Sequence, residues 1–258
     1  MRFHYNKTIL SLALSFFFLQ GCAKTASFSP SKDGEMLHFT ATIPEDLEAL
    51  PLFAMYRSEI CRKESRTANM KSYTVPGYHR EHYPLTILSS NKIEASIPKF
   101  DEGKCDWKLS NIVFEVKLKD PAKIDPLIST SFGFETTFVI DNNAPQTFDG
   151  GYLKKSGNME ETLVLFPLIS EHFIDGNIKQ FRLMGKDRVL TYKLSNANNI
   201  NIIVDYKSEM KTYWFGVKKK EAGNMATIIY PNGEKEKTRE IYPDYEKLIN
   251  ISESMHHK

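Results

Sequence analysis

Hydrophobic side chains that alternate with polar ones constrain the fold of this chain more than any other feature. Within residues 105–119, apolar side chains occupy every second position, at Ile112, Phe114, Val116 and Leu118. The positions between them are mostly charged, a pattern typical of a strand with one buried and one polar face. Short segments rich in Val, Ile, Thr, Phe and Tyr recur between turn signals along most of the chain, which predicts an all-β fold.

The strand pattern is interrupted at residues 141–145, where "DNNAP" collects turn residues and a proline. We therefore expect two antiparallel β-domains. Residues 36–145 would form a β-sandwich of about seven strands, similar in size to an immunoglobulin-like domain. Residues 146–258 would form an antiparallel β-meander with short polar connections.

Two segments of the second block have distinct signals. Residues 161–173, "ETLVLFPLISEHF", fit either a strand or a helix, although Pro167 argues against one continuous helix. Near the C-terminus, Pro243 at a first helical position, with acidic residues in the first turn, predicts a short helix.

The N-terminus carries an apolar run that ends at a cysteine. Arg2 and Lys7 precede about 11 mostly apolar residues, a length typical of a signal peptide and too short for a transmembrane helix, which needs ~20. The next residues, Leu19-Gln20-Gly21-Cys22, resemble the lipobox of bacterial lipoproteins. This resemblance implies that residues 1–21 are removed and that Cys22 is acylated.

An acylated Cys22 would hold the protein on a membrane, because several acyl chains together bind a bilayer firmly. Ala23 follows the cysteine, which by analogy with enteric lipoproteins implies the periplasmic face of the outer membrane. Residues 22–35 are small and polar without periodicity, so we expect a flexible tether there.

Two further cysteines, Cys61 and Cys105, would then lie in an oxidising compartment. We expect a disulfide between them, which would close a loop of about 40 residues and stabilise the fold by roughly 4 kcal/mol. The alternative is a metal site completed by His79 and His82 of "YHREHYP". Because zinc-binding cysteines usually come in close pairs, we expect neither a metal nor a cofactor.

Charge and motif content argue against several function classes. The chain has 34 basic and 32 acidic side chains, and loss of Arg2 and Lys7 would balance them. We therefore expect no concentrated basic surface for nucleic acid. The sequence contains no G-x-S-x-G, Walker, G-x-G-x-x-G or H-E-x-x-H motif, so we expect no catalytic residues and no enzymatic activity.

Aromatic residues in two segments are candidates for binding a partner. The first set is Tyr73, Tyr78 and Tyr83, in a region predicted as a loop; these tyrosines would alternatively cover a sheet edge and form local hydrogen bonds. The second set comes from Tyr213-Trp214-Phe215. Successive strand residues face opposite sides, so either Trp214 is buried while Tyr213 and Phe215 are exposed, or the reverse.

The lipobox, the segment "GKCDWKLSNIVFEVKLK" and Cys61 in "MYRSEICRK" are together similar to the periplasmic immunity lipoproteins encoded beside type VI secretion lipase effectors. The resemblance implies a stoichiometric inhibitor that binds a secreted antibacterial lipase or phospholipase, with Tyr73, Tyr78, Tyr83, Tyr213 and Phe215 as candidate contacts. Two alternatives stay open: an accessory lipoprotein of an envelope or secretion complex, and a periplasmic carrier of a small or lipidic ligand.

Overall fold

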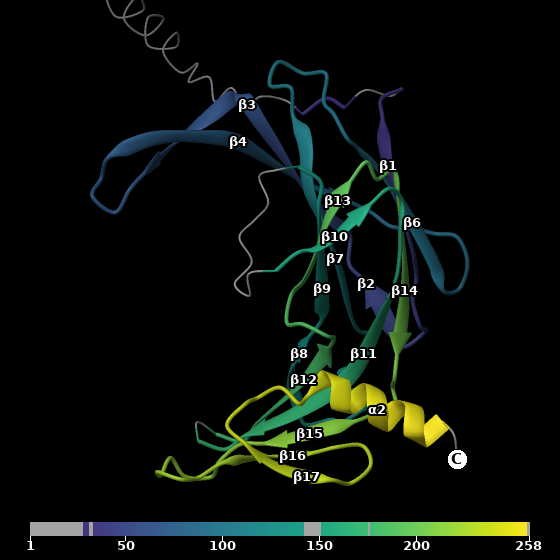
Figure 1. The fold of residues 1–258 in the computed structure, drawn as a ribbon, viewed down its shortest axis with the longest axis vertical. Coiled ribbons are helices and arrows are strands. Elements are labelled where there is room, and N and C mark those ends of the chain that lie inside the picture. The colour runs from purple at the N-terminus through teal and green to yellow at the C-terminus, as the bar shows by residue number, and fades with distance from the viewer. Residues whose placement is uncertain (1–27, 31–32, 142–150, 175, 257–258) are drawn as a thin grey trace, which may run out of the picture.

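The structure is a computed structural model that describes residues 28–30, 33–141, 151–174 and 176–256 (Figure 1). The expected signal peptide, residues 1–21, and the expected acylation site, Cys22, lie outside these residues. The elements are β1 (Met36–Thr42), β2 (Leu47–Ala49), β3 (Leu52–Arg66), β4 (Ser72–Tyr83), β5 (Thr86–Ile87), β6 (Lys92–Pro98), β7 (Lys108–Leu118), η2 (Pro121–Lys123), β8 (Ile128–Phe132), β9 (Phe134–Val139), β10 (Leu153–Ser156), β11 (Met159–His172), β12 (Ile178–Met184), β13 (Leu190–Ser195), β14 (Asn199–Tyr206), β15 (Thr212–Phe215), β16 (Ala226–Ile229), β17 (Lys235–Thr238) and α2 (Tyr245–His256). The prediction of an all-β fold with one short C-terminal helix is confirmed.

Two sheets form the body of the protein. The larger, ten-stranded sheet has the path β17-β16-β15-β11-β14-β1-β6-β5, with β12 paired to β11 and β8 paired to β12. The seven-stranded sheet has the path β10-β13-β9-β7-β3-β4, with β2 paired to β7. The ring of Phe39 in the larger sheet lies 4.9 Å from that of Phe114 and 6.2 Å from that of Phe138 in the smaller one. The two sheets therefore pack face to face around an aromatic core.

The pairing differs from the antiparallel one that we expected. Strand β1 pairs in parallel with β14, and β9 pairs in parallel with β13. Strands from residues 36–145 and from residues 146–258 therefore share both sheets, and they contribute to one sandwich core. In the second block, β15 and β16 form an antiparallel hairpin as expected, and β16 also pairs antiparallel with β17, a strand that the pattern did not predict. In contrast, β13 and β14 lie in different sheets.

Strand β11 resolves the ambiguity at residues 161–173 as a 14-residue strand. On one edge it pairs with β14 as far as Leu165 and then with β15 from Leu168 onward. Pro167, which has no backbone N–H to donate, lies in the gap between these two neighbours. The proline therefore lies where no neighbouring strand pairs with that edge of β11, and the strand can continue past it.

A second, smaller core lies around α2, at the end of the molecule shown at the bottom of Figure 1. Phe166 and Leu168 of β11, Trp214, Ile228 and Leu248 are among the side chains buried there. The helix begins one residue after Asp244, whose Oδ1 accepts a hydrogen bond from the amide of Lys247 at 3.1 Å. Asp244 therefore caps the helix, and Pro243, expected at the first helical position, precedes the cap.

Candidate functional site

The most prominent surface feature is a two-stranded hairpin that projects from the sandwich (Figure 1). We define the β3–β4 arm as residues 59–76. The pairing of β3 with β7 ends at Arg57, whereas its pairing with β4 continues to Arg66. Beyond the sandwich the two strands of the arm therefore pair only with each other, and almost every side chain of the arm is exposed or half-buried.

A bulge joins this arm to the sandwich. The register between β3 and β4 shifts between Ser58, which pairs with Gly77, and Lys63, which pairs with Val75, so four residues of β3 (59–62) lie opposite one residue of β4, Pro76. The side chain of Ser58 accepts hydrogen bonds from the amides of Ile60 at 3.1 Å and Cys61 at 2.8 Å, which satisfies part of the bulged backbone. Ser58 itself donates to the carbonyl oxygen of Cys105.

The predicted disulfide between Cys61 and Cys105 is confirmed, with the two Cα atoms 5.2 Å apart. It ties the bulge to a buried residue of the sandwich. Gly77 faces the bulge so closely that a Cβ there would overlap the carbonyl oxygen of Cys61 and would lie 3.2 Å from the ring of Trp107. Trp107 therefore packs beside the base of the arm.

The three tyrosines of the first candidate set have different surroundings. Tyr73 is 46% exposed on the arm, and its hydroxyl accepts a hydrogen bond from Ser65. Tyr78 is also exposed, and the Nζ of Lys63 lies 3.6 Å from the centre of its ring. Tyr83 is half-buried, and its hydroxyl lies 2.7 Å from that of Tyr56.

The pair of Tyr56 and Tyr83 has a structural role. The hydroxyl of Tyr56 also donates to the carbonyl oxygen of Pro98 at 2.8 Å. Burial raises the pKa of Tyr56 far above its usual range and raises that of Tyr83 as well. Of the first candidate set, only Tyr73 and Tyr78 therefore present exposed rings to a partner.

The second candidate set lies on the C-terminal part of the larger sheet. Trp214 is 8% exposed, and its Nε1 donates to the carbonyl oxygen of Glu240 at 2.9 Å on the side that α2 covers. Tyr213 and Phe215 point to the opposite side, where their rings lie 6.3 Å apart and nearly parallel. Tyr213 is 38% exposed. We call this side of β15–β17 the open face.

A groove of about 930 Å³ adjoins the open face. Its apolar lining includes Phe173, Phe215 and Met225, and the Nζ of Lys218 lies 5.8 Å from the ring of Phe173. Lys219 and Lys237 add further positive charge. Glu171, the single acidic residue of the lining, forms an ion pair with Lys179 at 2.7 Å. The groove is therefore lined by both apolar and cationic side chains.

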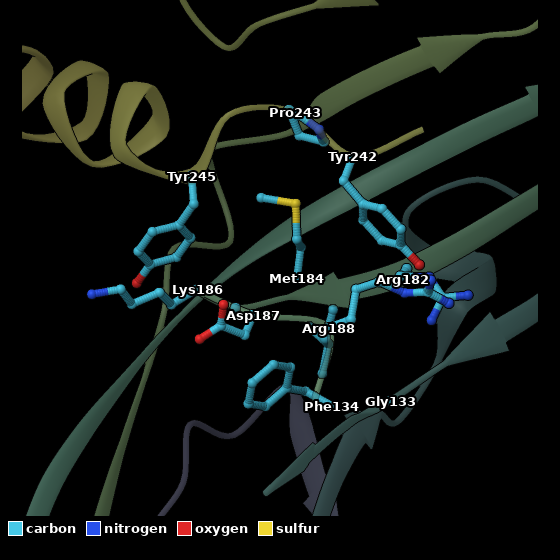
Figure 2. A pocket seen from close by; sticks show the side chains of 12 residues that line it. Gly133, Phe134, Arg182, Met184, Lys186, Asp187, Arg188, Tyr242, Pro243 and Tyr245 are labelled. Carbon is cyan, nitrogen blue, oxygen red and sulfur yellow. The ribbon is translucent and has the colours of Figure 1, made fainter. Parts of the chain in front are cut away.

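A second cavity, of about 270 Å³, lies between α2, β12 and the start of β9 (Figure 2). The guanidinium carbons of Arg182 and Arg188 lie 5.8 and 5.3 Å from the ring of Tyr242, and both arginines line the cavity. Asp187 shares this lining. The volume of this cavity lies just below the ~300–1,000 Å³ typical of sites for drug-sized ligands.

The two histidines of the alternative metal site, His79 and His82, have other contacts. The Nε2 of His79 lies 2.6 Å from Glu81 Oε1, while the ring of His82 lies 5.4 Å from that of Phe53. Cys61 and Cys105 are joined to each other and are not available to a metal. Within the described ranges no group of three or more metal-ligating side chains occurs, and none of the helices found there is long and apolar enough to cross a bilayer.

Sequence reasoning found the aromatic residues of the open face but missed the groove beside it. Phe173 and Met225 are 52 positions apart in the chain, and they meet because β11, β15 and β16 are neighbours in the sheet. The "KKKE" segment at residues 218–221 was the one local signal, and it lies in the loop between β15 and β16. The chain matches no protein-family model, and no curated protein or solved structure is significantly similar to it.

Proposed function

We propose that this protein is a lipid-anchored immunity protein of the periplasm, which binds and neutralises a secreted antibacterial lipase or phospholipase. The observation that carries the binding role is the open face with its cationic groove. Tyr213, which is 38% exposed, and the half-buried Phe215 form a stacked aromatic pair there, at the opposite end of the molecule from the arm (Figure 1). Aromatic anchors of this kind provide much of the binding energy of protein interfaces.

The charge of the groove specifies the chemistry of the partner. Lys218, Lys219 and Lys237 line the groove together with apolar side chains, and its one carboxylate, that of Glu171, is already paired with Lys179. An acidic segment with apolar side chains would complement this surface, because opposite charges steer association and exclude partners of the same charge. The partner surface that we propose is therefore an acidic, partly apolar face of the effector, close to the entrance of its active site.

Coexpression with the neighbouring effector tests this function. The reading frame encoded beside this protein would be produced with and without the mature protein, and phospholipase activity would be measured with purified components. We expect a one-to-one complex and loss of lipase activity. Full activity in the presence of excess binding protein would refute the proposal, and a neighbourhood of secretion genes without a lipase would favour an assembly role.

Variants of the open face test where the partner binds. The double variant Tyr213→Ala and Phe215→Ala should weaken inhibition about 100-fold, because two aromatic anchors together contribute ~3 kcal/mol. Tyr73→Ala removes a tyrosine of the arm that is even more exposed than Tyr213 and serves as the matched control. If the control lost as much inhibition as the double variant, the effector would not bind at the open face.

A further inference from the structure

The β3–β4 arm carries an excess of positive charge, most of it unpaired. Its cations are Arg62, Lys63, Arg66 and Lys71, and its acids are Glu59 and Glu64. The one ion pair within the arm, among the residues that the structure describes, joins Arg62 to Glu59. Lys63, Arg66 and Lys71 form no ion pair there, although the Nζ of Lys63 lies over the ring of Tyr78, and their charges can meet an external anion.

Exposed apolar side chains accompany these charges along the arm. Ile60 at the bulge is 65% exposed, Met70 at the turn is 67% exposed, and Tyr73 lies on the strand between them. From the bulge to the turn the arm extends about 20 Å, given ~3.3 Å per strand residue. The combination of basic and amphipathic side chains is typical of elements that lie in the interface of an anionic membrane.

The expected lipid anchor reaches the fold beside this arm. The ring of Phe28 packs 4.5 Å from that of Tyr56 and 4.8 Å from that of His79, at the base of the arm. Ser29 donates its amide to Asp101, so the chain is held to the sandwich already at this point, before the expected end of the tether at residue 35. Five residues lie between Cys22 and Phe28, and the six steps from one to the other span at most about 20 Å.

We propose that the β3–β4 arm lies on the anionic headgroup surface of the membrane that holds the lipid anchor, with its cations on lipid phosphates and its apolar side chains in the interfacial layer. This inference rests on acylation of Cys22, which is part of the proposed function. Because the anchor keeps the arm near the bilayer, contacts that are weak individually act at high effective concentration. The open face, at the other end of the long axis, is then directed away from the membrane (Figure 1).

Hydrogen exchange on vesicles tests this orientation without an effector and without bacterial processing. With the Cys61–Cys105 disulfide intact, Cys22 is the single free thiol of the mature chain and can be coupled to a maleimide phospholipid. We expect amides of residues 59–76 to exchange about tenfold more slowly on phosphatidylglycerol–phosphatidylethanolamine vesicles than on phosphatidylcholine vesicles. Salt at about 0.5 M should remove the difference, because screening shortens the reach of surface charge.

Charge-reversed variants supply the matched comparison. The arm variant carries glutamate at four positions, Arg62, Lys63, Arg66 and Lys71, and the control carries it at four positions near the groove, Lys218, Lys219, Lys220 and Lys237. We expect the arm variant to lose the protection and the control to keep it. A milder arm variant, with glutamine at Lys63, Arg66 and Lys71, retains the hydrogen bonds from Arg62 to Thr74 and should lose most of the protection.

Three results would overturn the inference. Equal exchange on the two kinds of vesicle would show that the cations serve only to keep the unpaired edges of the arm from aggregating. Equal loss in both charge-reversed variants would show that net charge rather than the arm is responsible. Protection of the arm by a soluble effector, and not by vesicles, would identify the arm as a protein-binding element. Palmitate labelling and lipase inhibition test the proposed function separately. Failure of the proposed function is therefore distinguishable from failure of the proposed contact between the arm and the membrane.

Discussion

Replacement of Gly77 by alanine tests how the arm is joined to the sandwich. A Cβ at this position would lie 3.0 Å from the carbonyl carbon of Cys61, would overlap its oxygen, and would lie 3.2 Å from the Trp107 ring. The disulfide to Cys105 limits how far the bulge can move away. We therefore expect Gly77→Ala to lower the free energy of unfolding by about 3 kcal/mol, the upper end of the usual cost of overpacking.

The disulfide determines the size of that effect. Without it, in the variant Cys61→Ala and Cys105→Ala, residues 59–62 can shift away from the new methyl group, and the cost of Gly77→Ala should fall to about 1 kcal/mol. Removal of the disulfide alone should cost about 4 kcal/mol, given a sequence separation of 44 residues. A double-mutant cycle should then give a coupling energy of about 2 kcal/mol, within the range of residues in contact.

Urea denaturation of the four proteins measures this coupling. Trp107, buried beside Gly77, reports unfolding of the sandwich by its fluorescence once Trp214 is replaced by phenylalanine in all four chains. With a denaturant slope near ~3 kcal/mol/M, Gly77→Ala should lower the urea midpoint by about 1 M in the disulfide-bonded protein. Effects that add within ~0.5 kcal/mol would refute the reasoning, because the glycine and the disulfide would then act independently.

Three further predictions concern other parts of the fold. Asp244→Ala removes the cap of α2 and should cost about 1 kcal/mol, measured as a lower thermal midpoint, while an unchanged midpoint would contradict the capping role. The hydrogen bond from Lys179 lowers the pKa of Asp125, so this pair stabilises the fold at neutral pH and the stabilisation is lost as the pH falls below the ordinary aspartate range. The thermal midpoints of wild type and Lys179→Met should therefore differ at pH 7 and converge near pH ~3, and a constant difference would argue against the pair. Burial raises the pKa of Tyr206 and of Tyr245 to about 12, whereas unfolded tyrosine titrates near ~10, so stability to urea should decline above pH ~10 and an unchanged urea midpoint there would contradict it.

Local patterns predicted the strands better than their pairing. In β7, Ile112, Phe114, Val116 and Leu118 are all buried, as the alternation indicated. Nothing local, however, identifies the neighbour of a strand. His38 pairs with Asn199, 161 positions away, and such contacts depend on the packing of the whole core rather than on propensity. This is why a boundary read from turn residues near position 145 gave two blocks whose strands in fact share both sheets.

The candidate sites show the same division. Strand periodicity correctly limited Trp214 to two arrangements, and the Nε1 contact with Glu240 explains why the buried one is adopted. The disulfide was predicted correctly from the expected oxidising compartment and from the two cysteines that remain after Cys22. The bulge at residues 59–62 gave no sequence signal of its own, since "EICR" resembles the strand residues before it. Gly77, across from the bulge, is the residue whose presence could have indicated a close backbone approach.

The two ends of the molecule are stabilised by different means, and this bears on how it would work. At the arm end, a disulfide, the buried Ser58 and the Phe28 contacts fix the base of the hairpin. At the other end, the core around α2 has no disulfide, and it joins the sandwich core mainly through the long strand β11. Opening of the α2 core would therefore require less free energy than opening of the sandwich. An effector that binds the open face should then slow exchange of residues 212–229 and 245–256 far more than that of the sandwich strands, and the reverse pattern would place the partner elsewhere.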